Sequence, residues 1–122
     1  MSIIVKRVYD QPAPDDGYRV LVDRLWPRGL THDAAQLDLW LRDIAPTTEL
    51  RTWYGHRVER WPEFQTRYAE ELKGHSALLD LIMDIERHRQ QVTLLFAARD
   101  QEHNEAQVIA AALVSRPAHA HH

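Results

Sequence analysis

Charged and hydrogen-bonding side chains gather in two short segments, each directly after an apolar, strand-like run. The first, residues 23–29, follows the run 18–22 and contains one aspartate and two arginines. The second, residues 99–104, follows the run 92–98 and combines an arginine with an aspartate, a histidine and an asparagine. A planar guanidinium suits bidentate binding of phosphate or carboxylate, and histidine titrates near neutral pH. Together these residue types predict an anion site with acid–base groups beside it.

Each residue of the two segments has an expected role that follows from its side-chain chemistry. The expected acid–base groups are Asp23, Asp100 and His103. The expected ligand-binding residues are Arg24, Trp26, Arg28, Arg99 and Asn104. Arg51 and His56 have two possible placements. They lie either at the rim of the predicted anion site or at the surface without special contacts.

The Asp23-Arg24 pair also has a purely structural interpretation. An aspartate and an arginine at the end of a strand can form an ion pair that locks a loop, because a buried carboxylate without a partner is costly. The protein would then be a non-catalytic regulatory or protein-binding module with an internal Asp–Arg network. The exposure of Arg24 and Arg28 distinguishes the two hypotheses.

The elements that must position these residues can be predicted from periodicity and breakers. Short apolar runs predict strands, and apolar residues at helical spacing with capping residues predict helices. The expected strands are 3–8, 18–22 and 92–98. The expected helices are 47–54, ending at Gly55, then one from Pro62 to Gly74, one from Ser76, and a closing helix over 106–113. Residues 31–44 are ambiguous, because Thr31 can cap a helix while Leu37, Leu39 and Leu41 alternate as in a strand. We expect an irregular segment with a short helix.

Strands that are apolar on both faces, interleaved with helices, predict an α/β fold. We expect a small, mostly parallel sheet covered by helices in two or three layers, Rossmann-like in outline. The long helical connection between the second and third strands suits a parallel crossover. The short connection after the first strand leaves an antiparallel or offset placement open. Residues 1–116 form the expected single domain, and residues 117–122 a flexible, histidine-containing tail.

The location of the site depends on how the strands pair. In open α/β sheets, ligands bind beyond the carboxyl ends of the strands, where helix N-termini point unpaired N–H groups at the ligand. The segments 23–29 and 99–104 meet there only if their strands are parallel neighbours.

Composition narrows the possible functions. The absence of cysteine excludes disulfides and thiol nucleophiles, and with no secretion signal we expect a cytoplasmic protein. The net charge of −3 argues against nucleic acid, so an arginine cluster on residues 51–67 is the weakest candidate interface. No apolar run is long enough to span a membrane. We expect no metal and no cofactor, since the histidines are scattered and no nucleotide-binding loop occurs. The oligomeric state is not determined by the sequence.

The motif Val22-Asp-Arg-Leu-Trp-Pro-Arg-Gly29 carries a family resemblance, which continues through Ala45-Pro46-Thr47 and Leu95-Phe-Ala-Ala-Arg-Asp100. Across nearly its whole length the chain resembles the YeaO-like branch of the bacterial family known as domain of unknown function 488. The resemblance implies a small α/β fold, rhodanese-like in outline, and brings no established activity. The wider family ends its last strand in a cysteine-containing turn similar to that of rhodanese-like domains. Here alanines stand in that turn, so a thiol mechanism is excluded.

Overall fold

The computed structural model describes residues 2–116, so the predicted tail, 117–122, lies outside the described residues. Four strands form one parallel sheet in the order β1-β4-β2-β3. The strands are β1 (Ile3–Arg7), β2 (Tyr18–Leu21), β3 (Leu39–Trp40) and β4 (Val92–Phe96). The α-helices are α1 (His32–Ala35), α2 (Thr48–Tyr54), α3 (Trp61–Lys73), α4 (Ser76–Arg89) and α5 (Glu105–Val114). The 3-10 helices are η1 (Pro14–Asp16), η2 (Arg42–Ile44) and η3 (Val58–Arg60).

Strand β4 lies between β1 and β2, and all five of its residues are buried. Leu94 is level with Val5 of β1 on one side and with Val20 of β2 on the other. The predicted parallel α/β sheet is therefore confirmed, and β2 and β4 are neighbours, as the meeting of the two polar segments requires.

Strand β1 lies at the sheet edge, parallel to β4, and β4 separates it from β2. The connection from β1 to β2 is short because it contains no α-helix. Instead η1 lies against the face of β4, where the Thr93 hydroxyl donates to the Asp16 carbonyl at 2.6 Å. At the start of β2, Gly17 has φ +67, and a Cβ there would lie 2.4 Å from the carbonyl oxygen of Gln91. This close approach lets the connection return directly to the sheet.

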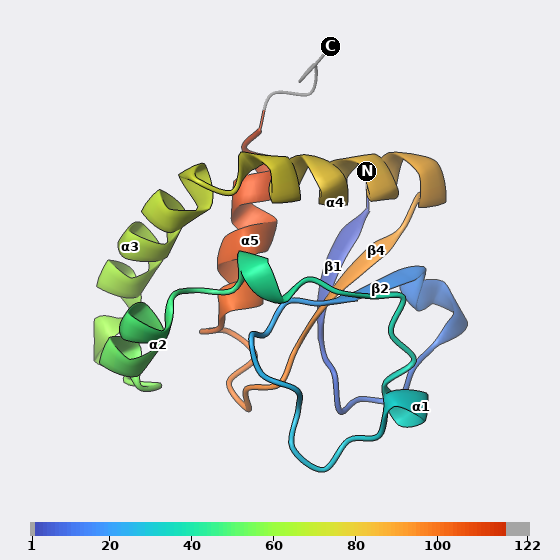
Figure 1. Cartoon of the computed structure of the whole chain (residues 1–122), viewed down its shortest axis with the longest axis horizontal. Coiled ribbons are helices and arrows are strands. Elements are labelled where there is room, and N and C mark those ends of the chain that lie inside the picture. The colour runs from blue at the N-terminus through green and yellow to red at the C-terminus, as the bar shows by residue number, and fades with distance from the viewer. Residues whose placement is uncertain (1, 117–122) are drawn as a thin grey trace.

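The two faces of the sheet are covered differently. Residues such as Val20, Leu94 and Phe96 pack in a large core with α2, α3, α4 and α5. On the opposite face Leu21 and Leu95 belong to a smaller core, covered by α1 and the loops around it. Figure 1 shows α2 and α3 at the left, α4 at the top and α1 at the lower right, away from the other helices. The fold thus has three layers, and the third is mostly loop.

The region expected to be irregular contains two short elements. Thr31 begins α1 by accepting a hydrogen bond from the Ala34 N–H at 3.0 Å, which confirms the short helix. Leu39 and Trp40 then form a two-residue edge strand that the sequence analysis did not assign. Helix α2 begins and ends as predicted, with Thr47 accepting from the Leu50 N–H and Gly55 in the left-handed conformation.

A buried charged cluster fixes the start of β2 to its surroundings. Asp16 and Arg19 are 2% and 4% exposed and form an ion pair, and Lys6 binds the same carboxylate at 3.0 Å. The Arg19 guanidinium also donates to the carbonyl oxygens of Ala35 and Gln36. Burial raises the pKa of Asp16, but hydrogen bonds from the Ala13 N–H, Lys6 and Arg19 outweigh it and leave this pKa below its ordinary 3.8.

We expect Asp16→Ala to lower the free energy of unfolding by about 3 kcal/mol, because it leaves a buried guanidinium without its carboxylate. The pKa of Asp16 is lower in the folded state, so its contribution is present above pH 3.8 and is lost as the pH falls through the folded-state pKa. Urea unfolding at several pH values measures both effects. The exposed neighbour Asp15, changed to alanine, is the matched control, with an expected change within about 0.5 kcal/mol. Equal effects of the two substitutions would contradict a stabilising role for the cluster.

Candidate functional site

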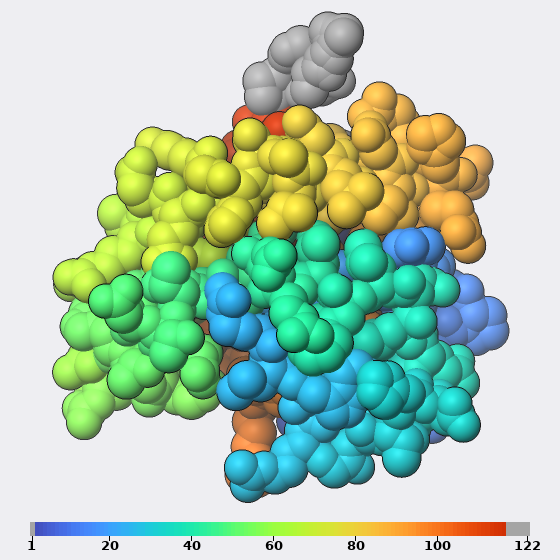
Figure 2. Space-filling model, viewed as in Figure 1, coloured from blue at the N-terminus to red at the C-terminus, as the bar shows by residue number. Residues whose placement is uncertain are grey.

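A cavity of about 450 Å³ opens at the carboxyl ends of β2 and β4. Its walls come from the segment after β2, from α2 and the turn before it, and from the β4–α5 connection. Figure 2 shows the hollow between the green residues of α2 and the blue residues that follow β2, with orange-brown atoms at its base. Its size lies in the range of small-molecule pockets.

Asp23 joins the two strand ends at the base of this cavity. Its Oδ2 accepts a hydrogen bond from the Ala97 N–H at 3.0 Å, directly after β4. Its Oδ1 is buried and has no hydrogen-bond partner among the described residues. The Asp23 backbone carbonyl accepts from the Trp40 indole N–H at 2.7 Å, which ties the same point to β3.

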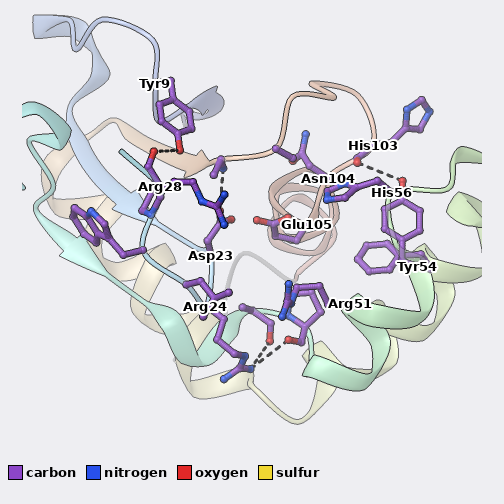
Figure 3. Close-up of a pocket in the computed structure, with 18 residues that line it drawn as sticks. Tyr9, Asp23, Arg24, Arg28, Arg51, Tyr54, His56, His103, Asn104 and Glu105 are labelled. Atoms are coloured by element: carbon purple, nitrogen blue, oxygen red, sulfur yellow. Dashed lines mark hydrogen bonds between the residues drawn. The ribbon is translucent and has the colours of Figure 1, made fainter. Parts of the chain in front are cut away.

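Glu105, the first residue of α5, faces Asp23 in the cavity. Figure 3 shows the two carboxyl groups directed toward each other. Burial, followed by the hydrogen bond and charge of Asp23, raises the pKa of Glu105 well above its ordinary 4.5, although its own backbone N–H and Arg51 favour the charged form. The Glu105 carboxyl therefore takes up a proton more readily than a solvent-exposed glutamate does. The sequence analysis missed Glu105, although its position directly after the predicted loop, at a helix start beyond a strand, was a usable signal.

The two arginines of the first segment have different surroundings. Arg24 donates to the carbonyl oxygens of Ala45 and Pro46 at 3.1 and 3.3 Å, and Figure 3 shows its guanidinium turned away from the carboxyl pair. Arg28 lines the cavity, is exposed and makes no side-chain hydrogen bond or ion pair with the described residues. The Tyr9 hydroxyl holds the backbone of this loop by donating to the Arg28 carbonyl at 2.7 Å. Arg24 therefore locks the loop, whereas Arg28 stays available.

Arg51 and His56, whose placement the sequence left open, both line the cavity. Arg51 comes from α2 and is close enough to Glu105 to act on its charge. Its guanidinium has no hydrogen-bond or ion-pair partner within residues 2–116. His56 follows α2 with φ 58, a left-handed conformation that turns the chain beside the cavity. The cavity thus gains a second available guanidinium.

The second polar segment mainly builds its own turn. Asp100 accepts from the N–H groups of Glu102 and His103 and from the His103 ring, and these bonds, that of Glu102 foremost, lower its pKa. The Asn104 side chain accepts from the Gln107 N–H and so caps α5. His103 and Asn104 line the cavity, but Asp100 and the exposed Arg99 do not.

Trp26 lines the cavity through a fixed indole ring. Its N–H donates to the Leu30 carbonyl at 2.6 Å, and its ring stacks on that of His32 with centroids 3.9 Å apart. Tyr54 and Phe64 stack on each other on the α2 side, with centroids 4.6 Å apart, and also line the cavity. Rigid aromatic surface therefore borders the charged groups on more than one side.

Two further features of residues 2–116 concern metals and membranes. These residues contain no group of three or more histidine, aspartate or glutamate side chains placed to hold a metal ion. None of their helices has the length and apolar character needed to cross a bilayer.

Comparisons with known proteins place the chain among uncharacterised relatives. A family model described as "Inactive DUF488-N3 subclade" matches residues 2–121. The chain is 45% identical to the uncharacterized protein Rv3073c of Mycobacterium tuberculosis over 112 residues, which is 92% of this chain and 93% of the relative. It is 42% identical to the uncharacterized protein YeaO of Escherichia coli over 110 residues, or 90% and 95% of the two chains. No solved structure matches the chain.

The different surroundings of Arg24 and Arg28 predict different effects on stability. Arg24→Ala removes hydrogen bonds to two backbone carbonyls and should lower the free energy of unfolding by about 2 kcal/mol. Arg28→Ala, the matched control in the same loop, should change it by less than about 0.5 kcal/mol. Chemical denaturation of the purified variants measures both values. A larger loss of stability for Arg28→Ala than for Arg24→Ala would contradict the roles assigned to the two arginines.

The raised pKa of Glu105 predicts a pH-dependent stability. Its contribution is complete below its ordinary pKa of 4.5 and is lost as the pH rises toward the folded-state pKa. Glu105→Gln cannot ionise, so its unfolding free energy should gain on that of the wild type by up to about 1.4 kcal/mol per pH unit in that window. Denaturation curves from pH 4 upward test this, with the exposed Glu102→Gln as control. Parallel pH profiles of wild type and Glu105→Gln would contradict the raised pKa of Glu105.

Proposed function

The chain belongs to the DUF488 family, and from its cavity we propose that it binds a small anionic ligand, phosphate- or carboxylate-bearing, at the carboxyl ends of β2 and β4. The observation that carries the proposal is a pair of guanidinium groups, on Arg28 and Arg51, that line the cavity without a hydrogen bond or ion pair to residues 2–116. Guanidinium groups offer planar, paired donors that match the oxygens of carboxylates and phosphates.

The charge balance of the cavity supports an anion. Its lining contains the two carboxyl groups of Asp23 and Glu105 against the three guanidinium groups of Arg24, Arg28 and Arg51. The cavity is therefore locally positive in a chain whose net charge is −3. A positive concave site with apolar walls concentrates anions even when the whole protein is acidic.

Several features favour binding over chemical turnover. The turn after β4 carries Ala97 and Ala98 and so supplies no nucleophile. The expected acid–base groups Asp100 and His103 bind each other in the turn, and Asp100 does not line the cavity. The word "inactive" in the description of the matching family agrees with a binding role. Asp23 is the one expected acid–base group that lies at the cavity base, beside Glu105.

The alternative is a regulatory or protein-binding module in which Asp23 and Arg24 are purely structural. One observation supports it: Asp23 binds the Ala97 N–H and Arg24 binds two backbone carbonyls, so both residues stabilise loops. It does not account for Arg28 and Arg51, which stabilise no described contact through their side chains. We therefore assign Arg24 to the scaffold and Arg28 and Arg51 to the ligand.

A panel of small phosphates and carboxylates, with inorganic phosphate included, should contain anions that raise the melting temperature, because a ligand that binds the folded state stabilises it. Arg28→Ala and Arg51→Ala should each weaken that binding about tenfold or more, as loss of a charge-assisted hydrogen bond does. Arg57→Ala, a surface arginine paired with Glu59 outside the cavity, is the control and should bind normally. Isothermal titration calorimetry gives the affinities. A panel without any binder, or equal losses in all three variants, would favour the structural module.

A further inference from the structure

The buried Oδ1 of Asp23 is an unsatisfied acceptor in the wall of the cavity. The other oxygen of this carboxylate is bound by the Ala97 N–H, but Oδ1 has no hydrogen-bond donor among the described residues. A buried carboxylate oxygen without donors is costly, and such atoms in native proteins call for an explanation. The arginine next in sequence does not supply the donor, because Arg24 is turned to Ala45 and Pro46.

Glu105 satisfies only part of this demand. A protonated carboxyl group has one O–H, and a carboxylate oxygen has two lone pairs. A proton held between Glu105 and Asp23 is the only donor that the two side chains can supply. Both side chains line the cavity and otherwise carry only acceptor oxygens.

Other parts of the lining carry hydrogen-bond donors instead of acceptors. Arg28 and Arg51 carry only donors, and their side chains have no hydrogen-bond or ion-pair partner in residues 2–116. A ligand with an anionic group alone would satisfy these donors but would bring further acceptors toward Asp23. A ligand with both an anionic group and an N–H or O–H donor would match both kinds of group. The stacked rings of Tyr54 and Phe64 provide an apolar surface for its body.

Resting on the proposed anion binding, we propose that the ligand is a small amino or hydroxy acid whose amine or hydroxyl donates to the Asp23 carboxylate in the cavity lining while its anionic group binds Arg28 and Arg51. Asp23 is then the residue that determines specificity, and Glu105 is a positioning residue that holds the Asp23 carboxylate toward the cavity. Amino and hydroxy acids share the required feature, which is a hydrogen-bond donor close to an anionic group on a partly apolar molecule.

Three acids with one carbon skeleton, and an amine that lacks their carboxyl carbon, test this requirement by calorimetry and thermal shift. L-phenylalanine carries carboxylate and ammonium, 3-phenyllactate carries carboxylate and hydroxyl, 3-phenylpropionate has only the carboxylate, and 2-phenylethylamine has only the ammonium. We expect phenylalanine or phenyllactate to bind at least about tenfold tighter than 3-phenylpropionate, since a site built around a hydrogen bond rejects the analogue that lacks it. 2-Phenylethylamine should bind more weakly than either, because it offers nothing to the guanidinium groups.

The variant Asp23→Asn keeps an oxygen for the Ala97 N–H but removes the charged acceptor, and it should reduce the preference for phenylalanine over 3-phenylpropionate to less than about threefold. Asp100→Asn, outside the cavity, is the control and should keep the preference. The comparison of probes on the wild type stands even if Asp23→Asn does not fold.

Equal, Arg51-dependent binding of phenylalanine, phenyllactate and 3-phenylpropionate would overturn the inference and leave the proposed anion binding intact. Failure of all four probes would also overturn it. The proposed anion binding would also be contradicted only if inorganic phosphate and the other anions of the panel left the melting temperature unchanged.

Discussion

The parallel pairing of β2 with β4 decides where the polar groups of this protein lie. The register that sets Val20 level with Leu94 brings the carboxyl ends of both strands to the same edge of the sheet. Asp23 then reaches the Ala97 N–H, and α5 begins beside that contact with Glu105 directed at Asp23. Because β4 is buried along its whole length, it cannot shift register without moving core residues on both faces. The cavity is thus a consequence of how the sheet is assembled.

Several effects oppose the raised pKa of Glu105 in the Asp23–Glu105 carboxyl pair. A glutamate at the first position of a helix is normally favoured in its charged form by the helix dipole and by nearby N–H groups. Here the backbone N–H of Glu105 and the charge of Arg51 act in that direction, yet burial and Asp23 outweigh them. Two negative charges so close together in a poorly solvated place repel strongly, and this repulsion favours the protonated form of Glu105. The fold accepts this cost at the cavity beyond the carboxyl ends of β2 and β4.

The sequence predicted the sheet and the general place of the site better than the membership of the site. Val92–Phe96 and Tyr18–Leu21 were recognisable because buried parallel strands are apolar on both faces. The β3 strand was not assigned, because the strand-like alternation of Leu37, Leu39 and Leu41 competed with a helix that Thr31 could cap. Asp100 and Arg99 were grouped with the site since they are near it in sequence, but a turn that bonds to itself keeps Asp100 out of the cavity. Glu105 was missed because a helix start is usually interpreted as scaffold, and only three-dimensional contact shows that it faces Asp23.

The position of these acids also changes how an anion can be held. The expected donors at this edge were arginine side chains and the unpaired backbone N–H groups of a helix start. Asp23 already occupies the Ala97 N–H, and the Asn104 side chain occupies the Gln107 N–H. The protein itself therefore uses these two backbone donors, and under the proposed function an anion is bound by side chains instead. Arg28 and Arg51 are the groups proposed for that task, and they come from two different elements, the loop after β2 and α2. Recognition in that proposal depends on the spacing between that loop and that helix, and Arg24 bridges the two by bonding to Ala45 and Pro46 just before α2.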